Sequence, residues 1–86
     1  MEVKFTPLAL EHLEFWKKSG NKQVQKKIQT LIEDIVKTPY HGIGNPHELK
    51  YNLYGAWSRR ITLEHRLVYE IIDGEILLIL RLKGHY

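Results

Sequence analysis

The chain of 86 residues contains no cysteine, and no stretch of about twenty residues is continuously apolar. The absence of cysteine excludes disulfide bonds and is compatible with a reducing cytoplasm. The absence of a long apolar run excludes a transmembrane helix. The first residues, Met1 to Phe5, also lack the basic and apolar regions of a secretory signal peptide. We therefore expect a cytoplasmic protein with no contact with the membrane.

The length allows one domain, residues 1–86, and the sequence contains no internal repeat and no linker between domains. A domain of this size buries only about 60% of the surface that its unfolded chain exposes. Binding to a partner chain would therefore stabilise it. A homodimer is compatible with the same argument.

Positive charge exceeds negative charge, with a net charge of +3 and a pI near 9.2. These totals alone are equally compatible with an ordinary solvated surface. The excess is concentrated between residues 45 and 66, which hold Lys50, Arg59, Arg60 and Arg66 against Glu48 and Glu64. Aromatic residues lie in the same stretch, although packing is their commoner role: Tyr51, Tyr54 and Trp57. The combination indicates a surface for nucleic acid.

The first half of the chain predicts a short strand and two helices. Val3 to Phe5 can form the strand, and Thr6-Pro7 is a typical helix start that Gly20 would end. Four residues fall on one face of this first helix: Leu8, His12, Leu13 and Trp16. Asn21 can cap a second, amphipathic helix that ends at Thr38-Pro39.

The second half predicts a loop followed by strands. Residues 38–55 are rich in glycine and proline, with one short strand around His47 to Leu53. Three longer strands are expected around residues 57–62, 65–72 and 75–83. The expected fold is therefore α+β, with the N-terminal strand and the helical hairpin packed on one face of an antiparallel sheet.

The turns between the strands determine which side chains share a face. Asp73-Gly74 predicts a two-residue hairpin turn that pairs Ile71 with Ile76, Tyr69 with Leu78 and Leu67 with Leu80. A three-residue loop at Leu63 to His65 would pair Ile61 with Leu67 and Trp57 with Ile71, which gathers the apolar residues on one face. This register directs Arg59 toward the core, for which the sequence offers no partner.

The same register predicts a basic face. Arg60 and Arg66 share the face opposite the helices, and continued alternation along the last strand would add Arg81, Lys83 and His85. A bulge at Gly84 would break this alternation. The pattern thus predicts a cluster of Arg60, Arg66 and His85 on the open face of the sheet.

Three motifs stand out in the second half of the chain: Trp57-Ser58-Arg59-Arg60-Ile61, Glu64-His65-Arg66-Leu67-Val68-Tyr69 and the final His85-Tyr86. At these spacings they closely resemble the Txe/YoeB-type toxins of the RelE superfamily, and the resemblance extends upstream to Thr38-Pro39. It implies a small RelE-like α+β ribonuclease of a type II toxin–antitoxin system. Such a toxin enters the A site of the 30S ribosomal subunit, cuts the mRNA there, and is held inactive by a cognate antitoxin.

The implied reaction needs no metal and no other cofactor. The ribose 2′-OH attacks the adjacent phosphate, so the enzyme must supply a base, an acid and positive charge. By similarity, Arg66 and then Arg60 would bind the phosphate, with Lys50 as a point charge. The alternation along the last strand adds Arg81 to the phosphate-binding residues, and Tyr51 is included because it is expected near the site. His85 would act as the acid, and Tyr86 would stack on a base or donate a hydrogen bond. In this interpretation His65 has a structural role, and His12 lies on the helix surface or at the edge of the core.

One position departs from the family pattern. Such toxins commonly have Pro-Glu-Pro-Leu-Lys, with the glutamate as base, whereas this chain has Pro46-His47-Glu48-Leu49-Lys50. His47 occupies the glutamate position and can take a proton when its ring is neutral. Glu48 would serve only if the segment slipped by one residue, because neighbouring residues of an extended segment point to opposite sides. A third alternative is that neither residue acts as a base.

Two other functions fit the same expected fold. One is a binding toxin without nuclease activity, like the ParE-type gyrase inhibitors, and the other is a plain RNA-binding module. The clustered arginines and the final His-Tyr favour the nuclease. No set of His, Cys, Asp and Glu has the spacing of a metal site, so we expect no metal.

Overall fold

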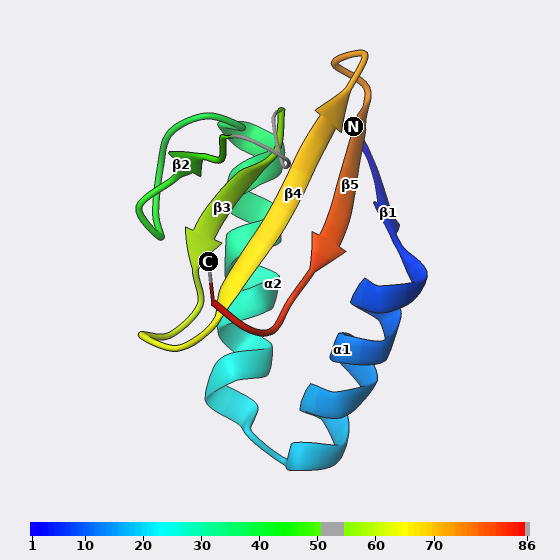
Figure 1. Cartoon of the computed structure of the whole chain (residues 1–86), viewed down its shortest axis with the longest axis vertical. Coiled ribbons are helices and arrows are strands. Elements are labelled where there is room, and N and C mark those ends of the chain that lie inside the picture. Colours follow the sequence, from blue (N-terminus) through cyan, green and yellow to red (C-terminus); the bar gives the residue numbers. More distant parts are fainter. Residues whose placement is uncertain (51–54, 86) are drawn as a thin grey trace.

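A computed structural model describes residues 1–50 and 55–85 of the chain. It shows a five-stranded sheet with two helices on one face (Figure 1). Along the chain the elements are β1 (Glu2–Phe5), α1 (Pro7–Ser19), α2 (Lys22–Lys37), β2 (His47–Glu48), β3 (Trp57–Arg60), β4 (Arg66–Ile72) and β5 (Ile76–Arg81). The order across the sheet is β1-β5-β4-β3-β2. The predicted α+β class is confirmed, but the sheet is mixed because β1 runs parallel to β5.

Both helices begin where their capping residues predict. The Thr6 hydroxyl accepts a hydrogen bond from the Ala9 N–H at 3.0 Å, and Pro7 occupies the first helical position. The Asn21 side chain accepts from the Val24 N–H at 3.1 Å and starts α2 in the same way. Gly20, with φ of +71°, ends α1 in the left-handed conformation that glycine adopts most readily.

The core lies between the helices and the sheet. Its fully or almost fully buried side chains include Ala9, Trp16, Ile28, Leu31, Ile35, Leu67, Tyr69, Leu77 and Ile79. The prediction that Leu8 belongs to the apolar face of α1 is wrong, since Leu8 is 43% exposed. Ala9, one position further on, packs into the core instead, which allows α1 to approach the sheet closely.

The predicted pairing of β4 with β5 is wrong by one residue. Asp73 and Gly74 do have the expected positive φ values, but Ile72 pairs with Ile76, so that Glu75 also belongs to the turn. The Glu75 carbonyl accepts from the Glu2 N–H at 2.9 Å and thereby serves the edge strand β1. Tyr69 consequently pairs with Ile79 rather than with Leu78, which exchanges the two faces of β5 relative to the prediction.

A second irregularity restores the predicted face of Arg81. The register shifts between Val68 and Tyr69, so that Tyr69 pairs with Ile79 while Val68 pairs with Arg81. Leu80 is the extra residue of a β-bulge. Arg81 therefore lies opposite Val68 and shares the face of Val68 and Arg66.

The connection between β3 and β4 is longer than predicted. Arg60 pairs with Arg66 and Trp57 with Tyr69, so the predicted partners of Ile61 and Trp57 are wrong by two residues. The loop is closed by Thr62, whose hydroxyl accepts from the Glu64 and His65 N–H groups at 3.1 Å each. Because a shift of two preserves the faces, Arg60 and Arg66 share the face opposite the helices, as predicted.

Arg59 points into the core and is completely buried. Its guanidinium pairs with Asp34 of α2 at 2.5 Å and lies 5.8 Å from the centre of the Tyr69 ring. It also donates to three main-chain carbonyls in the segment after α2, those of Thr38, His41 and Ile43, at 2.6–3.1 Å. A buried guanidinium is tolerated only when its donors have partners. The structure thus identifies the partners of Arg59 that the sequence did not reveal. Through these partners Arg59 connects α2, the following loop and β3.

The loop approaches this network closely at two glycines. A Cβ atom at Gly42 would collide with the Asp34 carboxylate, and one at Gly44 would lie 2.7 Å from Leu31 Cδ2. Both glycines have positive φ, which also favours glycine. The Gly44 carbonyl then accepts from the Arg60 N–H at 2.7 Å, which holds the loop against β3.

We expect Arg59→Met to lower the free energy of unfolding by about 3–5 kcal/mol, because it leaves the Asp34 carboxylate and several loop carbonyls without their donor. Arg60→Met is the matched control. It removes the same group from the neighbouring, exposed position and should change stability by less than about 0.5 kcal/mol. Urea denaturation of both variants measures the difference. Equal effects would mean that the buried network does not stabilise the fold.

Candidate functional site

Arg60 and Arg66 form the centre of the candidate site. They are direct cross-strand partners at the end of β3 and the start of β4, with Arg60 exposed and Arg66 half-buried. Side chains paired in this way lie about 5 Å apart at their Cβ atoms. Positive charges carried at paired positions repel each other, and an anion bound between them would offset that repulsion. The planar donors of guanidinium groups match phosphate oxygens. The pair can therefore bind a phosphate.

The segment before β3 brings His47 to the same face. His47 pairs with Ser58 and Glu48 pairs with Trp57 in the antiparallel ladder. Because Ser58 and Arg60 are two residues apart on β3, His47 belongs to the face of the arginines and Glu48 to the opposite face. Both side chains are exposed. Of the two candidate bases, the register favours His47.

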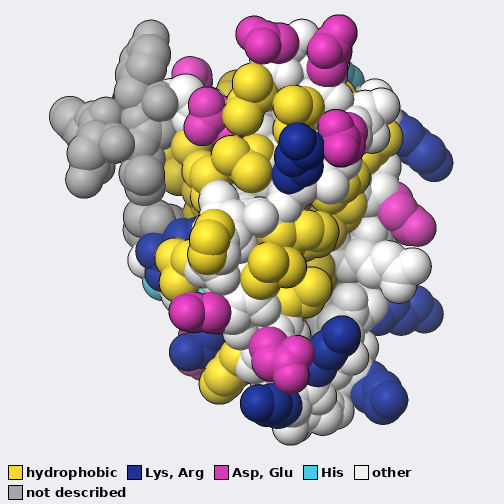
Figure 2. Space-filling model, turned by 90° about the vertical axis from the view of Figure 1, so that its right-hand side faces the viewer, with side chains coloured by type: hydrophobic (Ala, Val, Ile, Leu, Met, Phe, Trp, Pro, Cys, Tyr) yellow, Lys and Arg dark blue, Asp and Glu magenta, His cyan; other side chains and the backbone are white. Residues whose placement is uncertain are grey.

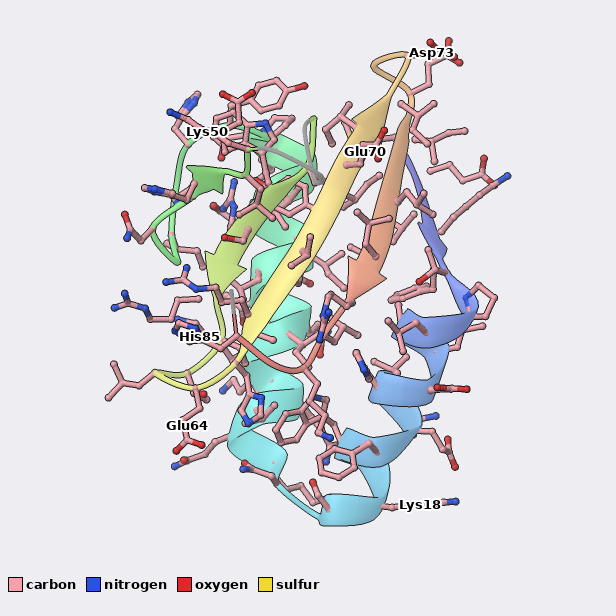
Figure 3. All side chains as sticks on the ribbon, in the orientation of Figure 1. Lys18, Lys50, Glu64, Glu70, Asp73 and His85 are labelled. Atoms are coloured by element: carbon pink, nitrogen blue, oxygen red, sulfur yellow. The ribbon has the colours of Figure 1, made fainter. Side chains whose placement is uncertain are left out.

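The end of the chain reaches this site by a path different from the predicted one. Strand β5 stops at Arg81, and Gly84 has φ of +96°, so the chain turns instead of continuing the alternation. The Gly84 carbonyl accepts from the Arg66 N–H at 2.9 Å, which brings the tail to the first residue of β4. In Figure 3, His85 lies where β3 ends and β4 begins. His85 is exposed there and directly follows Gly84, which is hydrogen-bonded to Arg66.

Two other predicted site residues, Lys50 and Arg81, are described by the structure. Lys50 is exposed beside β2, at the opposite end of β3 from His85 in Figure 3. The Arg81 guanidinium donates to the Lys83 carbonyl at 3.0 and 3.2 Å, so it braces the tail. Tyr51 and Tyr86 lie outside the described residues. Arg60, Arg66 and His85 thus lie at the same end of β3, and His47 belongs to the sheet face of the two arginines. Lys50 lies at the other end of β3.

His12 and His65 both bind main-chain groups, which confirms the structural role predicted for His65. Each accepts a main-chain N–H through Nδ1 at 3.0 Å, His12 from Leu82 and His65 from Gly84. Burial lowers the pKa of His12 below its ordinary value, and the nearby positive charges of Arg81 and Lys83 lower it further. The predicted packing role of Trp57 is confirmed by its ring contact with Tyr40, with centroids 5.0 Å apart.

Among residues 1–50 and 55–85 there is no group of three or more His, Cys, Asp and Glu side chains that could hold a metal ion. The same ranges contain no helix that is long and apolar enough to cross a membrane.

Comparison with known proteins identifies the family. The profile of the "YoeB-like toxin of bacterial type II toxin-antitoxin system" matches residues 5–86. The Toxin YoeB of Synechocystis sp. is 46% identical over 86 residues, which cover 100% of this chain and 98% of that protein. The chain belongs to the YoeB family of type II toxins.

Solved YoeB structures share the whole fold. The YoeB/ParE toxin from Agrobacterium tumefaciens superimposes with a TM-score of 0.95 at 37% identity, and all of both chains is covered. The Staphylococcus aureus YoeB-YefM complex contains a chain that is 40% identical, with a TM-score of 0.89 and coverage of 100% of this chain and 98% of that one. The same organism's YoeB dimer gives a TM-score of 0.90 at 39% identity, with the same coverage of both chains. The resemblance predicted from the motifs is confirmed.

Two features of this YoeB-family site were not predicted from the sequence. The first is the pairing of Arg59 with Asp34, which holds the loop leading to His47. The available signal was an arginine at a core-facing strand position, which requires a buried anion. The second is that His12 and His65 both contact the tail that carries His85. No sequence pattern relates these two histidines to the tail.

The lowered pKa of His12 predicts a pH dependence of stability. An unfolded histidine has a pKa of about 6.5, so as the pH falls the unfolded chain takes up the proton before the folded chain does. The contribution of His12 is therefore complete above about pH 6.5 and is lost as the pH falls through the folded pKa. His12→Asn keeps an acceptor but does not titrate. We expect the wild type to lose free energy of unfolding relative to this variant between about pH 7.5 and about pH 5. Urea denaturation at several pH values measures the difference, and a constant difference would contradict the assignment.

Proposed function

We propose that this YoeB-family toxin is a ribosome-dependent endoribonuclease that cuts mRNA in the A site of the 30S subunit. The observation that carries the proposal is the Arg60–Arg66 pair on the open face, with the His85 tail bonded to the same strand end. His47 shares that face. A cationic pair flanked by two imidazoles supplies the groups that phosphodiester cleavage requires.

The reaction would proceed without a metal. His47, as a neutral imidazole, takes the proton of the ribose 2′-OH while the 2′-oxygen forms a bond to the adjacent phosphorus. His85 donates a proton to the 5′-oxygen as its bond to phosphorus breaks. Arg66 and Arg60 bind the phosphate oxygens, whose negative charge increases in the transition state. The products are a 2′,3′-cyclic phosphate and a free 5′-OH.

We further propose a protein antitoxin as the partner that controls this site. The S. aureus relative was solved in a YoeB-YefM complex. Two surfaces of this chain suit such a partner: the basic site, which would attract an acidic chain rapidly at low salt, and an apolar side. Figure 2 shows hydrophobic side chains gathered on the side where β1 and α1 lie. Leu8, Leu10 and Phe15 of α1 are each more than 40% exposed. A homodimer, as solved for the S. aureus toxin, is a second proposed assembly.

The decisive experiment incubates the purified toxin with translating ribosomes and maps the new 5′ ends of the mRNA. We expect cleavage only in the presence of ribosomes, and we expect Arg66→Ala to slow single-turnover cleavage by about 10²–10³-fold, because it removes a donor to the phosphate. Lys26→Ala removes an exposed positive charge from α2, behind the sheet, and should leave the rate within about twofold. Absence of cleavage together with gyrase inhibition would favour a binding toxin like the ParE-type proteins.

Two further variants, at His47 and at Glu48, test which residue acts as the base. His47→Ala should slow single-turnover cleavage on ribosomes by about 10²–10⁴-fold, the usual contribution of a positioned base. Glu48→Ala should have a mild effect, since Glu48 belongs to the opposite strand face. The reverse ranking would transfer the role to Glu48. Two mild effects would mean that no side chain of this segment acts as the base.

A further inference from the structure

Residues 82–84 leave the sheet, and side chains of other elements bind their main-chain groups. His12 Nδ1 accepts from the Leu82 N–H, and the Trp16 indole donates to the Leu82 carbonyl at 2.9 Å. His65 Nδ1 accepts from the Gly84 N–H. Main-chain groups that lose their strand partners need such replacements when they are buried. Two histidines, one from α1 and one from the β3–β4 loop, therefore supply the acceptors for these two N–H groups.

The two rings are held in a form that can accept. An imidazole accepts at Nδ1 only when that nitrogen carries no proton. The charged groups around His12 are Arg81 and Lys83, which oppose its protonation, and Glu11, which favours it less strongly. The His65 ring lies edge-on to Trp16, with centroids 4.9 Å apart and an interplanar angle of 86°. The contact with Trp16 thus orients the His65 acceptor.

Other contacts leave the segment little freedom. The Arg81 guanidinium binds the Lys83 carbonyl, and the Arg66 N–H binds the Gly84 carbonyl. Gly84 adopts φ of +96°, and an added Cβ would lie 2.7 Å from Arg81 Nη2. His85 is the next residue. The main chain of His85 therefore follows a residue that is bound at both of its main-chain groups. His65 binds the Gly84 N–H, and Arg66 binds the Gly84 carbonyl.

We propose that His12 and His65 are positioning residues that direct the tail, and with it His85, to the phosphate bound by Arg66. This inference rests on the proposed function. The two imidazoles do not touch the RNA; they act through the Leu82 and Gly84 amides. Displacement of a reacting group by about 1 Å can slow a reaction by about 10²-fold, so small errors in the tail should reduce kcat.

The test separates the acceptor of His65 from its ring. His65→Asn keeps an acceptor oxygen, bonded to Cγ as Nδ1 is, but loses the ring. His65→Phe keeps a ring against Trp16 but has no acceptor. We expect the Gly84 amide to exchange its hydrogen about tenfold faster in His65→Phe than in His65→Asn, measured by NMR. We expect kcat for mRNA cleavage on ribosomes to fall by about 10²-fold in His65→Phe with little change in KM, and to be largely retained in His65→Asn.

The same pair of substitutions at His12 tests the Leu82 amide, and His41→Phe, at an exposed loop histidine, is the control for amide exchange. Retention of both amide protection and kcat in His65→Phe, with losses in His65→Asn, would assign the effect to ring packing and overturn the proposal. Unchanged kcat despite a loosened Gly84 amide would also overturn it. If the wild type failed to cut mRNA, the proposed nuclease function would fall, whereas the exchange data would still show whether the histidines hold the tail.

Discussion

The burial of one positive charge, that of Arg59, determines the arrangement of the middle of the chain. A guanidinium with no exposure to water needs a counter-ion and acceptors for its remaining donors. Asp34 provides the counter-ion from α2, and the loop that follows α2 provides the carbonyls. The Arg59 guanidinium and the Ile43 N–H together keep the pKa of the Asp34 carboxyl below its ordinary value. In the observed arrangement of the loop, the guanidinium and the carboxylate both have partners.

This arrangement has a consequence for the open face. Arg59 and Arg60 are neighbours on β3, so burial of the first directs the second to the opposite side of the sheet. The same loop then leads into β2, where His47 enters the ladder opposite Ser58. A buried ion pair of this kind stabilises less than its Coulomb attraction suggests, because both charges lose water. The ion pair has a larger effect on the arrangement of the chain. It connects α2 to β3, which carries Arg60, and Arg59 also binds the loop that leads to His47.

The tail illustrates how main-chain requirements create a site. Strand β5 ends at Arg81, and beyond it the Arg66 N–H of β4 still binds the Gly84 carbonyl. Side chains from α1, from the β3–β4 loop and from β5 bind further main-chain groups of residues 82–84. The positive charges of Arg81 and Lys83 near His12 also oppose its protonation. Charge and hydrogen bonding thus act together on the last residues before His85.

Much of the fold could be predicted because its signals are local. The caps at Thr6 and Asn21, the stop at Gly20 and the period of α2 depend on neighbouring residues, and all are confirmed. The shared face of Arg60 and Arg66 was also predictable, since it needs only the parity of the loop, and an error of two residues preserves parity. The family followed from motifs that the comparisons confirm.

Only the tertiary structure could decide the registers, the partner of Arg59 and the path of the tail. Glu75 joins the hairpin turn while serving distant β1, and the bulge at Leu80 offsets that shift at Arg81. Asp34 and Arg59 are 25 residues apart, and His12 and Leu82 are 70 apart. Sequence alone determined which side chains alternate on a strand and where the helices begin and end, because those depend on adjacent residues. Contacts between distant residues depend on how the layers pack, so only the folded chain specifies them.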